Sequence, residues 1–226
     1  EGESKTNAHY LIQTAESLSM ILTDLLDHAK MEARQLTLQP VPTDVAELVR
    51  GVSALSRVAS EAKGLKLNIN IDLPPHRFIV DPGRLRQVIQ NLLSNAVKFT
   101  HSGSIELQAR LDTDASDKGG APKLIIRVCD TGMGIPEDKR DNLFKPFSQL
   151  HSDPQNKMGG TGLGLSIVHN LIVLMRGSLA YLPNNPQGSI FEIRMPVTFE
   201  QAELQITRWQ AEYGPDETII LIDQPT

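Results

Sequence analysis

The chain has little cysteine, no excess of basic residues and no long hydrophobic run, and each absence excludes a class of protein. One cysteine among 226 residues rules out an intrachain disulfide framework, and Cys129 is expected to be a core residue. The net charge of −5 gives no case for nucleic-acid binding. No stretch is apolar enough to cross a bilayer, and no signal peptide is visible. The length suits one substantial domain plus a helical appendage.

What is present begins with residues 81–100, DPGRLRQVIQNLLSNAVKFT, which predict a helix with two different faces. At about 100° per residue, five polar residues share one stripe: Arg84, Gln87, Asn91, Asn95 and Lys98. The opposite arc is apolar and is expected to face the core: Leu85, Val88, Ile89, Leu92, Leu93 and Ala96. Asparagine is a mediocre helix former, so two on a solvent-facing stripe are unusual. Carboxamide oxygens suit a hard cation and a lysine suits phosphate, although an ordinary amphipathic helix is the alternative.

A second informative segment is LIIRVCDTGMGI at residues 124–135, which predicts a strand ending in an aspartate and a glycine-spaced turn. A buried carboxylate at Asp130 could accept a hydrogen bond from the exocyclic amine of adenine. It would reject guanine, which presents an acceptor at that position. Gly132 and Gly134 allow the backbone to turn sharply and to approach a flat ring closely. The alternative is a strand–turn–helix corner in which the aspartate merely caps.

A third segment, GGTGLGLSIVHNLIVLM at residues 159–175, places a glycine cluster before a predicted helix. Free backbone amides at such a helix start favour phosphate groups. The segment has neither the third glycine of a dinucleotide fingerprint nor the GK[ST] ending of a P-loop. Because a bare glycine-rich turn is common, the specificity comes from the order of the three segments. Phe144 and Phe147 lie between the last two.

This ordered set closely resembles the ATP-binding catalytic part of sensor histidine kinases, over about residues 40–197. NLLSNAVKFT is similar to the N box, DTGMGI to the G1 box, LFKPFSQ to the F box and GGTGLGLSI to the G2 box. The resemblance implies an α+β fold of the Bergerat (GHKL) type, a two-layer α/β sandwich with a mixed sheet, preceded by a long dimerisation helix. Hydrophobic alternation predicts a strand at 65–71, and further strands are expected near 78–80, 104–111, 124–129, 178–183 and 189–195.

The resemblance also implies a site for ATP and Mg²⁺. Asn95 would coordinate Mg²⁺ with help from Asn91, Lys98 would reach a phosphate, and Asp130 would receive the adenine amine. The other nucleotide-binding residues that it implies are Gly132, Gly134 and Ile135 near the base, Phe144 and Phe147 anchoring a lid, and Gly160, Thr161, Gly162, Leu163 and Gly164 around the phosphates. The lid would span about residues 149–158. Lys157 in this segment could touch a phosphate, although a solvated lysine is the favoured interpretation.

Asn91 separates kinases from hydrolases within this resemblance. ATPases of the same fold, such as Hsp90 and the mismatch-repair and gyrase proteins, resemble one another in carrying glutamate there, which can activate water as a general base. An asparagine has no useful basicity, so attack by water is expected to be poor. Transfer of phosphate to a protein nucleophile is then the favoured chemistry.

Residues 1–38 contain an almost strict heptad seam: Leu11, Ala15, Leu18, Leu22, Leu25 and Ala29. The seam predicts a dimerising bundle helix; a single helix packed on its own domain is the alternative. The segment resembles the second helix of the dimerisation and histidine-phosphotransfer domain. The first helix of that domain would carry the acceptor histidine, and no such H box occurs in this sequence, so self-phosphorylation in cis is not expected.

Residues 39–43, QPVPT, predict a hinge, and the ATP-binding domain is expected at 44–197. Thr43 is expected to cap the helix that opens this domain.

Residues 198–226 are expected to be a linker toward a possible receiver domain. A helix is expected at about 200–213, and IILID at 219–223 resembles the strand that opens a receiver in hybrid kinases. An extra strand on the edge of the sandwich is the alternative.

The function that the resemblance implies is the catalytic part of a two-component sensor histidine kinase of the hybrid type, which transfers the γ-phosphoryl group of Mg·ATP to a histidine for relay to a response regulator. The implied partners are a second copy bound through the Leu11–Ala29 seam, the histidine-bearing helix of the same kinase, a response regulator or receiver domain, and another kinase in a heterodimer. The expected setting is a cytoplasmic module of an inner-membrane sensor protein. The alternative is a catalytically weak regulatory module, which two departures from the family pattern keep open: Lys145 replaces the usual Glu, and Arg176 a common Gly.

Overall fold

The structure is a computed structural model that describes residues 22, 25–27, 29–31, 33, 35–113, 121–148 and 162–200. Its first labelled elements are β1 (Val41–Thr43), α2 (Val45–Ala62), β2 (Lys66–Asp72), β3 (Phe78–Val80), α3 (Pro82–Phe99) and β4 (Ser104–Asp112). They are followed by β5 (Lys123–Asp130), the short 3₁₀ helix η1 (Glu137–Asn142), α4 (Gly164–Leu174), β6 (Ser178–Pro183) and β7 (Ser189–Pro196). The expected strands are all present, and each end differs from its predicted position by at most one residue.

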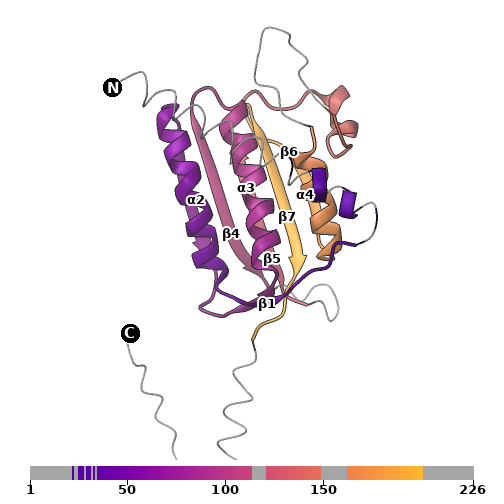
Figure 1. Cartoon of the computed structure of the whole chain (residues 1–226). Helices are drawn as coiled ribbons and strands as arrows, with labels where there is room; N and C mark the ends of the chain where they lie inside the picture. Colours follow the sequence, from indigo (N-terminus) through magenta and orange to yellow (C-terminus); the bar gives the residue numbers. More distant parts are fainter. Residues whose placement is uncertain are drawn as a thin grey trace, which may run out of the picture.

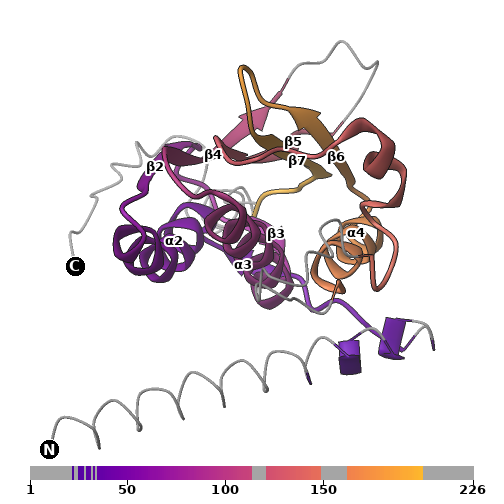
Figure 2. The ribbon, with the colours of Figure 1, turned by 90° about the horizontal axis from the view of Figure 1, so that it is seen from above.

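Five strands form one mixed sheet in the order β2-β4-β5-β7-β6. Strand β2 runs parallel to β4, whereas the other neighbouring strands are antiparallel. The helices α2, α3 and α4 lie side by side over one face of this sheet (Figures 1 and 2). The predicted two-layer α/β sandwich with a mixed sheet is therefore confirmed.

The hydrophobic core lies between the sheet and the three helices. All six residues predicted on the apolar arc of α3 are at most 3% exposed. The alternation predicted for β2 is also confirmed, because Leu67 is buried, and Ile69 and Ile71 pack against the core. This packing fixes the rotation of α3 about its own axis, and so fixes where its polar stripe points.

The start of α2 differs from the prediction. Thr43 was expected to cap this helix, but the cap is Asp44, whose side chain accepts a hydrogen bond from the amide of Glu47 at 2.9 Å. Thr43 is instead the last residue of β1 and pairs with Phe78 of β3. Thr43 therefore pairs in a strand with a residue distant in sequence, although local capping rules favoured it as the N-cap of α2.

The segment predicted as a hinge, residues 39–43, is attached to the domain at two points. The amide of Gln39 donates a hydrogen bond to Oδ2 of Asp81 at 2.8 Å, and residues 41–43 pair with β3. The chain that leaves β7 also passes β3, where Phe199 forms a bridge with Phe78. Phe199, two residues past the predicted domain boundary at residue 197, therefore still contacts β3.

The sheet face away from the helices carries both charged and apolar side chains, among them Arg127, Glu192 and Ile125. Cys129 lies on this face, half-buried, because strand alternation turns its neighbours Val128 and Asp130 inward; the prediction of a core cysteine is wrong. Burial, and then the negative charge of Glu106, raise the pKa of its thiol. On the same face Glu192 is held between Arg127 and Arg194, and these arginines lower the pKa of its carboxyl although burial acts to raise it.

Several predicted features lie outside the described residues: the seam up to residue 21, the lid at 149–158, the helix beyond residue 200 and the strand at 219–223. Within the described ranges, no helix is both long and apolar enough to span a bilayer.

Candidate functional site

The polar stripe of α3 occupies the border between core and solvent. Its five members are all half-buried, whereas Gly83, Arg86, Gln90 and Ser94 are the exposed residues of the same helix. The first half of the stripe, Arg84 and Gln87, hydrogen-bonds to Asp27. In the second half, the side chains of Asn91, Asn95 and Lys98 make no hydrogen bond or ion pair with another described residue. Among the described residues, the second half is therefore the part of the stripe whose polar groups remain unengaged.

The start of α4 lies directly against this unengaged half. A Cβ placed on Gly164, the first residue of α4, would lie 3.1 Å from Oδ1 of Asn91. The N-cap residue, Leu163, makes no side-chain cap hydrogen bond, so among the described residues no capping side chain occupies the first-turn amides. The preceding Gly162 has a φ of 71°, a conformation that favours glycine. The glycine-rich turn therefore brings an electropositive helix end to the carboxamide of Asn91.

Asp130 ends β5 and is 5% exposed. Its Oδ1 accepts hydrogen bonds from the amides of Gly132 at 2.9 Å and Ser189 at 3.2 Å. Burial raises the pKa of this carboxyl, and the bonds from Gly132 and Ser189 partly offset the rise. The side-chain amide of Asn184 donates to the backbone carbonyl of Asp130 at 2.8 Å, which fixes the strand end as well. The carboxylate is therefore held in one orientation inside the domain.

The turn after Asp130 packs on the C-terminal end of α3. A Cβ on Gly132 would overlap the carbonyl oxygen of Phe99, so only glycine fits without a backbone shift. Gly134 has a φ of 69° and faces the backbone of Gly188, in the turn between β6 and β7. Ile135 packs against the core, which anchors the end of the turn. Asp130 is thus placed beside the end of α3 that carries Lys98.

Lys98 is a half-buried cation. Burial lowers the pKa of its ammonium, and no carboxylate among the described residues pairs with it. Its Nζ lies 5.0 Å from the centre of the Phe99 ring. A cation that has lost hydration without gaining an anion is a suitable partner for a phosphate group.

The two phenylalanines of the F-box segment have different surroundings. Phe144 packs on the core, and its ring stacks on His169 of α4 with centroids 5.4 Å apart. Phe147 is 63% exposed and has a φ of 60°. Its backbone lies so close to Gly162 that a Cβ there would be 2.9 Å from the Phe147 Cα. The described residues on either side of 149–161 therefore meet at this point. Gly160 and Thr161, which were also predicted to bind nucleotide, lie outside the described residues.

Both departures from the family pattern lie away from this site. Lys145 donates a hydrogen bond from Nζ to Oδ1 of Asn142 at 2.7 Å, within an exposed turn. Arg176 follows the end of α4 with a φ of 58°, the left-handed conformation in which glycine is favoured after a helix. Among the described residues, neither side chain hydrogen-bonds or forms an ion pair with the stripe, the Asp130 turn or the start of α4.

The sequence predictions missed the contribution of the β6–β7 region. Ser189, Gly188 and Asn184 hold Asp130 and its turn from more than fifty positions away. The sequence did contain one indication of this contact, the glycine of the NNPQGS turn before the strand predicted at 189–195. However, nothing in the sequence showed which strand would pair with the strand at 189–195. The register of β5 and β7, which sets Asp130 opposite Ser189, supplies the connection.

Comparison with known proteins identifies the family. Residues 80–198 match the family described as histidine kinase-, DNA gyrase B-, and HSP90-like ATPase. The chain is 36% identical over 196 residues to the autoinducer 2 sensor kinase/phosphatase LuxQ of Vibrio harveyi, a match that covers 86% of this chain and 23% of that protein. It is 40% identical over 182 residues to the sensor histidine kinase RcsC of Escherichia coli, covering 80% of this chain and 18% of that protein.

Solved structures give the same result. Full-length ShkA, crystallised in complex with AMPPNP, matches with a TM-score of 0.72 and 30% identity, over 88% of this chain and 40% of that one. The Acinetobacter baumannii histidine kinase AdeS matches with a TM-score of 0.64 and 28% identity, over 83% and 82%. The chain therefore belongs to the histidine kinase-, DNA gyrase B- and HSP90-like ATPase family, as an ATP-binding domain of the sensor histidine kinase type. The resemblance to this kinase family and the predicted fold are confirmed, and the chain spans about a quarter or less of the curated relatives cited.

Proposed function

We propose that this chain is the catalytic part of a hybrid sensor histidine kinase, which binds Mg·ATP and transfers its γ-phosphoryl group to a histidine on a separate bundle helix. One observation carries the proposal: two distant segments meet the C-terminal half of α3. The start of α4 lies against Asn91, and the Asp130 turn lies against Phe99. Three side chains on that half of the helix have no hydrogen-bonding or ionic partner among the described residues.

Asp130 would select the base. Both amides that hold its carboxylate donate to Oδ1, so Oδ2 is the oxygen that we assign to the exocyclic amine of adenine. A buried acceptor facing the carbonyl oxygen of guanine would leave two acceptors unpaired, which costs about 1–3 kcal/mol. Adenine nucleotides are therefore expected to bind in preference to guanine nucleotides.

The second half of the α3 stripe would hold the triphosphate. Lys98 and the first-turn amides of α4 supply positive charge, and Asn95 with Asn91 supplies carboxamide oxygens for Mg²⁺. The metal, when bound, would neutralise phosphate charge and orient the group to be transferred. The donor set fits, since Asn91 directs its Oδ1 toward the start of α4, where phosphates are favoured.

The same residues favour transfer over hydrolysis. Asn91 has no useful basicity, so it cannot activate water as a glutamate at this position would. The site would act through position and charge, as phosphoryl transfer requires, and the nucleophile would be a histidine from another helix.

The partners follow from the N-terminal segment. Among the described residues of the predicted seam, Leu22 is 52% exposed and Leu25 49%, and the neighbouring Leu26 is 59% exposed. Apolar side chains at this spacing support packing against further bundle helices. We therefore propose a homodimer or a heterodimer with another kinase through this helix, and relay to a response regulator or receiver domain. We also propose that the chain is a cytoplasmic module of an inner-membrane sensor.

Phosphorylation of the complete parent kinase tests the proposal. The protein is incubated with Mg·ATP labelled at the γ-phosphate, and acid-labile, base-stable phosphate on protein is counted. Wild type should gain phosphohistidine, and Asp130→Ala should gain none. Release of inorganic phosphate with no labelled protein, or no consumption of ATP at all, would contradict the kinase assignment.

A further inference from the structure

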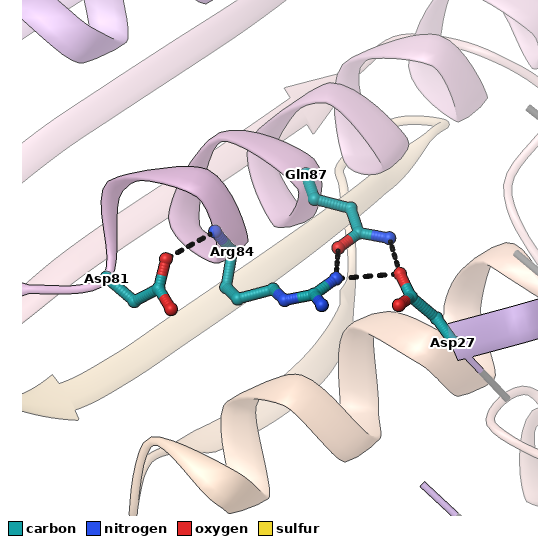
Figure 3. A network of polar contacts seen from close by, with 4 residues as sticks. All are labelled: Asp27, Asp81, Arg84 and Gln87. Atoms are coloured by element: carbon teal, nitrogen blue, oxygen red, sulfur yellow. Dashed lines mark hydrogen bonds and ion pairs between the residues drawn. The ribbon is translucent and has the colours of Figure 1, made fainter. Parts of the chain in front are cut away.

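A closed network of three side chains joins the N-terminal segment to α3 (Figure 3). Oδ2 of Asp27 accepts hydrogen bonds from Nη1 of Arg84 and from Nε2 of Gln87, both at 2.7 Å. Gln87 in turn accepts a hydrogen bond from the same Arg84 nitrogen at 2.8 Å. Each of the three side chains therefore contacts the other two, and we call this set the Asp27 clamp.

The Asp27 clamp is shielded from solvent. The side chain of Asp27 is 6% exposed and that of Arg84 is 25% exposed. The neighbours of Asp27 on its own helix are different: Leu25, Leu26 and Lys30 are all exposed. Met31, one turn further along this helix, packs against the core, so among the described residues the buried Asp27 carboxylate adds a directional polar contact to an apolar one. A buried carboxylate that loses its partners is strongly disfavoured, so the contact is specific in register.

The Asp27 clamp lies next to the ligand-binding half of α3. Gln87 and Asn91 are four residues apart on the same stripe, so they are neighbours on the helix surface. A second attachment lies at the start of the helix, where Asp81 caps α3 through the amide of Arg84 and also binds the amide of Gln39. The N-terminal helix and the connecting chain are therefore both tied to the helix that carries Asn91 and Asn95.

We propose that Asp27 is a positioning residue for phosphoryl transfer: through Arg84 and Gln87 it sets the orientation of the ATP-binding domain relative to the bundle helix. This inference rests on the proposed function. The side chain of Asp27 bonds to Arg84 and Gln87, neither of which is predicted to bind nucleotide. We therefore expect its loss to leave the ATP site intact. It changes the placement of the site relative to the acceptor histidine, because transfer needs close alignment between that histidine and the γ-phosphate.

The first test measures phosphoryl transfer in the complete parent kinase. Asp27→Asn keeps the shape of the side chain but removes its charge. We expect the initial rate of phosphohistidine formation to fall at least tenfold, with the KM for ATP within twofold of wild type. The charge exchange Asp27→Arg with Arg84→Asp should recover a substantial part of the rate. Lys30→Ala, on the exposed face of the same helix, is the matched control and should transfer at the wild-type rate.

A second measurement needs no kinase activity. In this 226-residue chain, Asp27→Asn should speed amide hydrogen exchange in residues 29–31 and 35–40 while α4 and β7 keep their protection. Exchange and transfer that both stay at wild-type values would overturn the positioning role, and so would a loss of ATP affinity equal to the loss of rate. If wild type forms no phosphohistidine, the proposed function fails as well, whereas the exchange result still decides whether the Asp27 clamp holds the helix.

Discussion

The two halves of the α3 stripe have the same helical spacing and similar burial, but opposite states of hydrogen bonding. In the N-terminal half, Arg84 and Gln87 are engaged by Asp27, a residue of this chain. In the C-terminal half, the side chains of Asn91, Asn95 and Lys98 find no hydrogen-bonding or ionic partner among the described residues. The comparison teaches that one helix face can be attached to its own chain at one end and left unengaged at the other, where we propose that ligand binds. Substitutions in the first half should therefore act on stability, and those in the second half on nucleotide binding.

The largest effect is expected at Gly132, where the Asp130 turn meets the end of α3. In Gly132→Ala, the added methyl group would overlap the carbonyl oxygen of Phe99, so the backbone has to shift. We expect a loss of about 2–3 kcal/mol in the free energy of unfolding, together with loss of ATP binding. Gly51→Ala in α2 is the matched control: its nearest neighbour is the flexible end of Arg86 at 3.9 Å. It should stabilise by about 0.5–1 kcal/mol. Urea denaturation of both variants measures these changes. If Gly132→Ala and Gly51→Ala had equal free energies of unfolding, the close packing at Gly132 would be contradicted.

Asn95→Ala tests the ligand-binding half directly. Its carboxamide makes no hydrogen bond within the described structure, so thermal stability should stay within about 0.5 kcal/mol of wild type. Affinity for Mg·ATP should fall roughly 30-fold, or about 2 kcal/mol, because a metal ligand is lost. Calorimetric titration with and without Mg²⁺ measures this. An unchanged affinity in Mg²⁺ would show that the stripe does not hold the metal.

Arg84→Met tests the attached half and should give the opposite result. It leaves the carboxylate of Asp27 buried without its cation, and Arg84 itself is partly exposed. We therefore expect a loss of about 1–2 kcal/mol in the free energy of unfolding. Affinity for Mg·ATP should remain within twofold. A large loss of nucleotide affinity would show that the two halves of the stripe are not separate.

Asp130→Asn tests whether the buried charge of this carboxylate lowers the stability of the domain. Because burial raises the folded-state pKa of Asp130 above its usual 3.8, its ionised form opposes folding as the pH rises through that raised pKa. The neutral amide can still accept from both backbone amides, so the variant should be as stable as wild type, or up to about 1 kcal/mol more stable, at pH 7. The gain should vanish below pH 3.8. Unfolding measured across this pH range would refute the account if the variant were least stable at pH 7.

The smallest effect is expected at Arg176, outside both halves. Its φ of 58° is costly for a side chain with a Cβ. Because glycine also gains entropy in the unfolded chain, Arg176→Gly should stabilise by only about 0.5 kcal/mol. Thermal melts measure the difference, with nucleotide affinity expected to stay unchanged. If the variant were less stable than wild type, the side chain of Arg176 would make a contact that stabilises the fold by more than its backbone strain destabilises it.

Local patterns predicted much of this molecule because they depend on neighbours in sequence. The two faces of α3 follow from its 3.6-residue period, and the Asp130 turn follows from a strand that runs into glycines. Long-range pairing could not be predicted in this way. Thr43 was lost as a cap because it pairs with Phe78, and Ser189 reaches Asp130 only through the register of β5 and β7. The role of Arg84 depends on Asp27, which is 57 positions away.

Equilibrium binding of Mg·ATP and Mg·GTP to this chain tests most directly whether the Asp130 turn, the start of α4 and the second half of the α3 stripe form one nucleotide site. The account predicts saturable binding of Mg·ATP by wild type, weaker binding of Mg·GTP, and loss of ATP binding in Asp130→Ala. Equal affinity for both nucleotides, or binding of ATP that survives in Asp130→Ala, would contradict it.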